Sequence, residues 1–153
     1  QDTFNAAHYH QALAARCRPL PRVSLAPLPA VSILVRGCIA WVEQVEGILM
    51  NNALRFSECS PQPVEVSAGL DAREWRLRVH DHGAGFPPHL AGELTRPFTI
   101  GQILHHQEGT GLSLARGALL AERMGGCLEA SSQGAGLGAT FVLRLPRAGQ
   151  TLA

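Results

Sequence analysis

The chain is 153 residues long, 46% of its residues are apolar, and its net charge is +1. A chain of this length can bury one sizeable hydrophobic core, so we expect one domain. A nearly neutral charge gives no electrostatic reason to expect nucleic acid as a partner. No apolar run approaches the roughly 20 residues of a membrane-spanning helix, so we expect no direct membrane contact. The first residue is Gln1 rather than Met, which favours a piece of a longer protein whose other part could hold a membrane segment. We expect the piece itself to be cytoplasmic.

The cysteines and histidines show no metal-ligand spacing. Neither the pair His8 and His10 nor the pair His105 and His106 has a companion cysteine or acid nearby, so we expect solvated histidines. No C-x-x-C pair occurs, and the cysteines are too sparse for a disulfide framework. We therefore expect four reduced thiols, at Cys17, Cys38, Cys59 and Cys127.

Apolar periodicity and proline positions predict the elements of the first half of the chain. Four prolines between residues 19 and 29 allow only short or edge strands there. The predicted elements are a helix over Phe4–Arg18, a strand over Val31–Val35 and a helix over Trp41–Ser57.

The second half predicts two hairpins and one helix. Trp75, Leu77 and Val79 alternate with polar residues, which is typical of a half-buried strand. Regular pattern is absent from Asp81 to about Glu108, and so long a loop is usually functional, often a lid. The predicted elements are strands over Val64–Leu70, Trp75–Asp81, Cys127–Ser131 and Thr140–Leu145, with a helix over Thr110–Met124. This order predicts an α+β fold, a two-layer sandwich in which helices cover one face of a mixed β-sheet.

Two polar features of the first half carry possible chemistry. Asn52 lies on the apolar stripe of its helix, where a buried asparagine satisfied by backbone is equally common. Asp81-His-Gly-Ala-Gly85 follows a strand. It is either an ordinary turn or a buried carboxylate that accepts a hydrogen bond from a ligand amine.

Two glycine-containing segments of the second half are also candidates. Gly109-Thr-Gly-Leu-Ser113 opens a helix, where exposed N–H groups and the helix dipole favour phosphate, although a flexible hinge has the same composition. Gly138-Ala-Thr-Phe141 is the weakest signal, since many strands begin this way.

Taken in order, the four segments resemble the ATP-binding fold of the GHKL superfamily, and most closely the catalytic domain of sensor histidine kinases. Val42-Glu-Gln-Val45 and Asn52-Ala-Leu-Arg-Phe-Ser57 are similar to that family's N box. Asp81 to Gly85 matches its first glycine box, Arg96-Pro-Phe98 its phenylalanine box, and Gly109 to Leu112 its second glycine box. Gly138 to Pro146 resembles its last strand, so the resemblance runs from about residue 23 to 146.

The resemblance implies a role for each matching residue. Asn52 would hold Mg²⁺, Arg55 would reach the ATP phosphates, and Phe56 would pack on the adenine. Asp81 would accept the adenine amine, and His80 and His82 would flank it in the pocket wall. The remaining expected contacts are Gly83, Gly85 and Thr140 around the adenine, Phe98 in the lid, and Gly109, Thr110, Gly111 and Leu112 at the phosphates.

Three departures from the family pattern leave alternatives open. Ile48 stands where a second asparagine is usual, Ser113 replaces a third glycine, and the lid has no lysine. A GHKL hydrolase would need a general base at position 48, which isoleucine cannot supply. An anti-sigma-factor-type serine kinase and a degenerate nucleotide-binding interaction module both remain possible.

The resemblance also implies a division of the chain and a set of partners. Residues 1–22 would be a leading helix and linker from a dimerisation region, 23–146 the ATP-binding domain, and 147–153 a tail. The partners would be ATP or ADP, the histidine-bearing dimerisation helices of the parent kinase and, through the parent, a response regulator.

Overall fold

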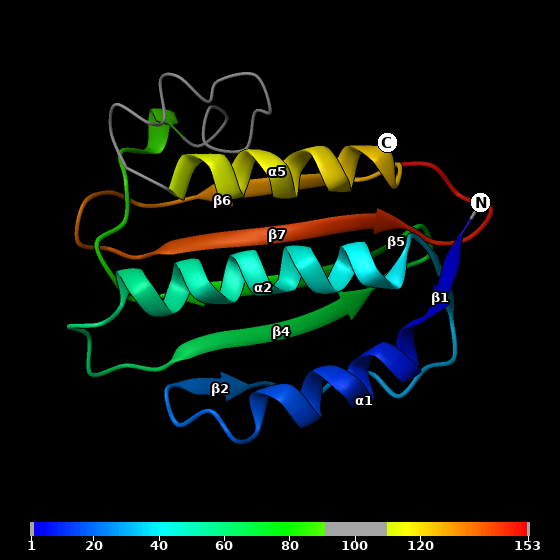
Figure 1. Ribbon diagram of the computed structural model, residues 1–153, viewed down its shortest axis with the longest axis horizontal. Coiled ribbons are helices and arrows are strands. Elements are labelled where there is room, and N and C mark those ends of the chain that lie inside the picture. The colour runs from blue at the N-terminus through cyan, green and yellow to red at the C-terminus, as the bar shows by residue number, and fades with distance from the viewer. Residues whose placement is uncertain (1, 91–109, 153) are drawn as a thin grey trace.

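The computed structural model describes residues 2–90 and 110–152, in which strands and helices form two layers (Figure 1). The strands are β1 (Thr3–Asn5), β2 (Val23–Leu25), β3 (Leu34–Arg36), β4 (Val64–Leu70), β5 (Glu74–Asp81), β6 (Cys127–Ser131) and β7 (Ala139–Pro146). The helices are α1 (Ala6–Cys17), α2 (Ile39–Phe56), α5 (Thr110–Arg123) and a 3₁₀ turn, η1 (Pro88–Leu90).

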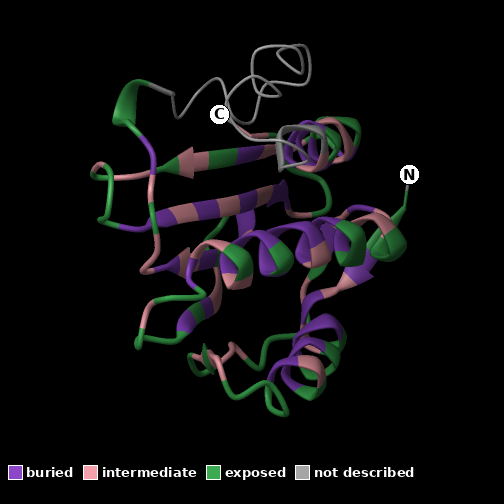
Figure 2. Ribbon diagram, turned by 60° about the vertical axis from the view of Figure 1, so that its left-hand side comes forward, coloured by how far each residue is buried: buried purple, intermediate pink, exposed green. Residues whose placement is uncertain are grey.

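The main sheet has the order β2-β4-β5-β7-β6 and is mixed, because β2 pairs with β4 in parallel while the other pairs are antiparallel. Helices α2 and α5 lie across the same face of this sheet (Figures 1 and 2). The opposite face is called the open face below. The predicted α+β sandwich is confirmed, because the helices cover one face of a mixed sheet.

Alternation along β5 divides the molecule into a buried side and an open side. Trp75, Leu77 and Val79 are almost fully buried toward the helices, whereas Arg76 and Arg78 point to the open face. Figure 2 shows the same banding of buried and exposed residues along strands and helices. The predicted alternation is confirmed, and it places Asp81 on the helix side.

Helix α1 is attached to the sheet and to α2 by buried polar contacts. The Tyr9 hydroxyl donates to Glu46 Oε1 at 2.6 Å, and Arg16 donates to both oxygens of the same carboxylate at 2.6 and 2.8 Å. Trp75 Nε1–H donates to His10 Nε2 at 2.9 Å, while His10 Nδ1 contacts the Pro29 carbonyl at 2.8 Å. The expectation of a solvated His10 is therefore wrong.

Strand boundaries near the amino terminus differ from the sequence prediction. The strand expected over Val31–Val35 lies at Leu34–Arg36, because pairing with Thr3–Asn5 fixes its register. β2 is only three residues long and lies at the edge of the sheet, as the prolines predicted.

The hydrophobic core runs across the predicted boundary at residue 22. Phe4, Tyr9 and Leu13 are buried in the same cluster as the side chains of α2 and the sheet. Near the other end, Arg147 N–H donates to the Arg73 carbonyl and Ala148 N–H to the Leu34 carbonyl. The division at residues 22 and 146 stays a prediction.

Two expectations from composition can be compared with the structure. Within residues 2–90 and 110–152, no helix is both long and apolar enough to cross a membrane. All four cysteines are free thiols, as expected.

Candidate functional site

A narrow cleft opens between α2, α5 and the adjoining ends of β5 and β7. Its volume among the described side chains is about 20 Å³, so a ligand of any size requires the lining side chains to move apart. The lining residues are Asn52 and Phe56 on α2, Asp81 at the end of β5, Gly85 and Phe86 in the loop after it, Leu114 on α5, and Ala139 and Phe141 on β7.

Asp81 is a buried carboxylate at the carboxyl end of β5, with 1% of its surface exposed. Its Oδ1 accepts the Gly83 N–H at 2.9 Å. Burial raises the pKa of Asp81, and hydrogen bonds from the backbone of Gly83 and Ala139 oppose that shift without cancelling it. This acceptor in an apolar cleft is suited to a ligand N–H donor.

Asn52 contributes an unsatisfied donor to the same cleft. Its side chain is 6% exposed, and its Nδ2 has no hydrogen-bond partner within the described part of the chain. A buried amide without a partner costs on the order of 1–3 kcal/mol. Since Asn52 lies on the buried stripe of α2, its amide could reach water only by leaving the helix–sheet interface. A ligand would supply the missing partner.

Close backbone packing explains the glycines of the first glycine box. A Cβ atom on Gly83 would lie 1.9 Å from the Phe56 carbonyl oxygen at the end of α2. Gly85 has φ +65°, and its Cβ would meet the Gly134 carbonyl at 2.4 Å. The Gly138 N–H also donates to the Gly83 carbonyl at 3.1 Å. The loop after Asp81 is thereby held against both α2 and the β6–β7 turn.

Two predicted neighbours of the adenine lie on the other face of the sheet. His80 pairs across the sheet with Thr140, and His80 Nδ1 contacts the Thr140 hydroxyl at 2.7 Å. Side chains alternate along a strand, so residues next to Asp81 and Ala139 point away from the cleft. The structure therefore corrects the placement of Thr140 and His80, and Ala139 occupies the cleft position assigned to Thr140. His82, also expected in the pocket wall, lies beside His80 on the open face.

The other predicted contacts are only partly described. Phe56 lines the cleft, while Arg55 is exposed near the end of α2. Phe98 and Gly109 lie outside the described residues, as do His105 and His106. The remaining three, Thr110, Gly111 and Leu112, form the first turn of α5, and their side chains are not described.

Sequence reasoning missed the apolar wall of the cleft. Its residues are Phe86, Leu114, Ala139 and Phe141. Strand alternation from Asp81 and its cross-strand partner Ala139 would have found Phe141, and the helical spacing of α5 would have found Leu114.

A larger groove of about 700 Å³ lies between α1 and the proline-containing segment at residues 26–30. It lacks the features of the cleft, because the nitrogens of its buried His10 are already paired and its other lining side chains are mostly apolar. Size alone does not make it a nucleotide site.

Comparison with known families identifies the fold. Residues 38–149 match the family described as histidine kinase-, DNA gyrase B- and HSP90-like ATPase. The chain belongs to this family. The match includes Asn52, Asp81 and both sides of the cleft, so the predicted superfamily is confirmed.

The curated relatives are sensor histidine kinases. Sensor protein TorS of Escherichia coli is 36% identical over 105 residues, which are 69% of this chain and 11% of TorS. The two-component sensor PprA of Pseudomonas aeruginosa is 37% identical over 128 residues, which are 80% of this chain and 13% of PprA. The chain thus spans about a tenth of these relatives.

Solved structures support the same fold. The mycobacterial sensor histidine kinase MprB superposes with a TM-score of 0.68 at 18% identity, covering 99% of both chains. The ATP-binding domain of PrrB from Mycobacterium tuberculosis has a TM-score of 0.67 at 23% identity, covering 95% of this chain and 96% of its own. The family match and the curated relatives, together with this fold, show that the chain is an ATP-binding domain of the histidine-kinase type.

Proposed function

We propose that this chain binds Mg-ATP in the cleft between α2 and the end of β5, and donates the γ-phosphate to a histidine on the dimerisation helices of its parent kinase. The observation that supports this most strongly is the pairing of a buried carboxylate, Asp81, with an unsatisfied buried amide, Asn52, in one cleft. Curated relatives that are named as sensor histidine kinases supply the reaction class.

The adenine would occupy the apolar part of the cleft. Asp81 would accept a hydrogen bond from the exocyclic amine. This bond would give the buried carboxylate a donor while the carboxylate stays ionised. Phe56 and Phe141 would contact the ring faces or edges. Because the cleft is narrow, we expect Phe56, which is only half-buried, to move when the ring enters.

The donor set near Asn52 fits magnesium held mainly by phosphate. Mg²⁺ prefers oxygen ligands and usually keeps one or two protein ligands together with water and substrate phosphates. The Asn52 carbonyl oxygen would be the protein ligand, and Ile48, one turn earlier, supplies none. Bound magnesium would neutralise phosphate charge during transfer.

The phosphates would extend from Asn52 toward the start of α5. The N–H groups of Gly109, Thr110, Gly111 and Leu112 would donate to them, since a helix amino terminus favours anions. Arg55, exposed near the end of α2, would add a planar cation. Phosphoryl transfer depends mainly on such positioning and charge stabilisation.

The position of Glu46 argues against a hydrolase. A hydrolase needs a carboxylate that activates water next to the metal. Glu46 is buried against α1, where Tyr9 and Arg16 already occupy both of its oxygens, and Ile48 cannot act as a base. The chain therefore lacks a base on the cleft side of α2.

The acceptor histidine would come from another part of the parent. His10 cannot serve, because it is buried and both ring nitrogens are engaged. We further propose that the parent passes the phosphate to a response regulator, and that this domain works in the cytoplasm, where ATP is available.

The proposal is tested by incubating the isolated chain with γ-labelled ATP and magnesium, with and without the parent's dimerisation helices. We expect acid-labile, base-stable label on the helices only, and no transfer by Asn52→Ala. An Asn51→Ala variant, changed at an exposed neighbouring position, is the control and should keep its activity. Stoichiometric label on the isolated chain would contradict a separate acceptor. Absence of transfer by a chain that binds ATP would favour a non-catalytic module.

A further inference from the structure

Three potential metal ligands meet on the open face of the sheet, on the far side of β5 from the cleft. One ligand atom each from Glu65, His80 and His82 lies within 4.8 Å of the other two. Sheet register brings them together, because Glu65 on β4 is the direct partner of His80 on β5. His82 follows two residues later and, by the two-residue period of a strand, returns to the same face.

Three contacts hold the side chains of this cluster close to one another. His82 Nε2 and Glu65 Oε2 are in direct contact at 2.5 Å, and the rings of His80 and His82 are perpendicular with centroids 4.7 Å apart. His80 Nδ1 contacts the Thr140 hydroxyl at 2.7 Å. When Nδ1–H donates to Thr140, Nε2 carries the free lone pair, which is how an outer partner orients a metal-binding histidine.

The charges around the cluster act on a bound cation in opposite directions. Arg78, two residues before His80 on the same face, would oppose a bound metal, while Asp81 behind the sheet would favour it.

We propose that Glu65, His80 and His82 bind zinc or a similar divalent transition metal. Two imidazoles and one carboxylate suit zinc, with water in the fourth position, whereas magnesium prefers oxygen alone. With Zn–N bonds of about 2.0–2.1 Å, tetrahedral ligand atoms lie about 3.3 Å apart. His82 Nε2 and Glu65 Oε2 must therefore move apart and release the proton between them to solvent, while the wider pairs close from at most 4.8 Å. The half-exposed Glu65 side chain has room for this movement.

A metal held here would join β4 to the end of β5. That end carries Asp81 between the two histidines, so the metal would stiffen the strand that positions the adenine-facing carboxylate. Because the ligands come from the folded sheet, metal binding would also stabilise the domain.

Calorimetric titration of the nucleotide-free chain with ZnCl₂ tests the site. All proteins carry Cys59→Ser, which removes the exposed thiol as a competing ligand. We expect one zinc per chain, and at least about tenfold weaker binding by His80→Gln, His82→Gln and Glu65→Gln. His8→Gln, at an exposed position on α1, is the matched control and should bind zinc as tightly as the Cys59→Ser protein does.

Cobalt absorption identifies the ligands independently. Co²⁺ should give the visible bands of a four- or five-coordinate nitrogen–oxygen site without thiolate charge transfer, and zinc should abolish them. If His80→Gln fails to fold, as judged by circular dichroism, Glu65→Gln decides, since that side chain is half exposed. Unchanged zinc affinity in a folded Glu65→Gln, a thiolate spectrum, or no saturable binding would each overturn the proposal.

Discussion

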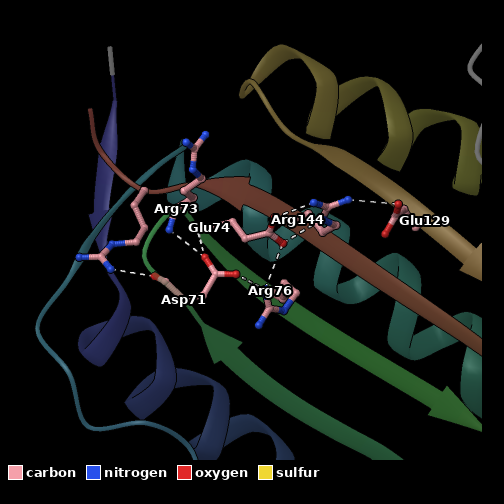
Figure 3. A network of polar contacts seen from close by, with 7 residues as sticks. Asp71, Arg73, Glu74, Arg76, Glu129 and Arg144 are labelled. Atoms are coloured by element: carbon pink, nitrogen blue, oxygen red, sulfur yellow. Dashed lines mark hydrogen bonds and ion pairs between the residues drawn. The ribbon is translucent and has the colours of Figure 1, made fainter. Parts of the chain in front are cut away.

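The open face of the sheet and its helix-covered face each carry a buried carboxylate, Glu74 and Asp81, and the two have opposite surroundings. On the open face, Arg144 donates to both oxygens of Glu74 at 2.6 and 2.8 Å, and Arg76 donates to it at 3.2 Å (Figure 3). On the helix side, the residues that the structure describes give Asp81 only backbone N–H groups and leave Nδ2 of the neighbouring Asn52 without a hydrogen-bond partner.

The pKa shifts of the two carboxylates have opposite signs for this reason. Hydrogen bonds from Arg144 lower the pKa of Glu74, while burial raises the pKa of Asp81. A carboxylate already supplied with cations stabilises the fold, and one left short of partners is available to a ligand. We therefore interpret the polar groups around Glu74 as structural and propose that those in the cleft bind the ligand.

The largest expected effect on stability and binding is at Gly83, where the loop beside the cleft packs against the end of α2. In Gly83→Ala the new Cβ would overlap the Phe56 carbonyl, so we expect about 3 kcal/mol or more of lost stability and no nucleotide binding. Urea unfolding measures the stability, and calorimetry measures nucleotide binding. Gly47→Ala is the control within α2; it meets no atom within 4 Å and should raise stability by up to about 1 kcal/mol. Equal behaviour of the two variants would remove the close approach as the reason for Gly83.

A smaller effect is expected from Glu74→Gln on the open face. Losing the charge-assisted bonds to Arg144 should cost about 1–3 kcal/mol of unfolding free energy at neutral pH, with nucleotide affinity unchanged. Since the folded pKa is lowered, this stability is present above the ordinary Glu value of 4.5 and is lost as the pH falls below it.

The control for Glu74 is its exposed neighbour in the same network. Glu129→Gln removes a pair with Arg144 at 3.2 Å whose carboxylate is 55% exposed, and should change stability by less than about 1 kcal/mol. Denaturant unfolding of both variants between pH 3 and 7 is the measurement. A loss in Glu74→Gln that persists undiminished at low pH would contradict an ion-pair origin.

The smallest effect on stability is expected from Asp81→Asn without ligand. Its sign is opposite to that of Glu74→Gln, because this substitution should stabilise the fold. A raised folded pKa means that the protonated form favours folding, and that this contribution is lost as the pH rises through the folded pKa. Asp81→Asn should thus raise the unfolding free energy at pH 7, with the gain shrinking as the pH falls toward 3.8. Denaturant unfolding at several pH values would show it. Destabilisation at pH 7 would mean that Asp81 has structural partners comparable to those of Glu74.

Sequence reasoning predicted the fold closely because periodicity reports burial directly. The buried stripe of α2 and the alternation of β5 fixed which side Asn52 and Asp81 occupy. The predicted position of Thr140 was wrong, because the motif names the residues of the last strand but does not say which face of the sheet each one occupies. The cross-strand pairing with His80 decides the face of Thr140. The cluster of Glu65 with two histidines could not be predicted, since register between β4 and β5 brings together residues 15 and 17 positions apart.

Titration of Mg-ADP into the wild type and Asp81→Asn tests the account most directly. Replacing a buried charged acceptor costs about 1.5–3 kcal/mol, so the variant should bind roughly ten- to a hundredfold more weakly. Glu129→Gln, on the open face, should bind as the wild type does. Unchanged affinity in Asp81→Asn, or a wild type that binds no nucleotide, would contradict the assignment of the cleft as the nucleotide site.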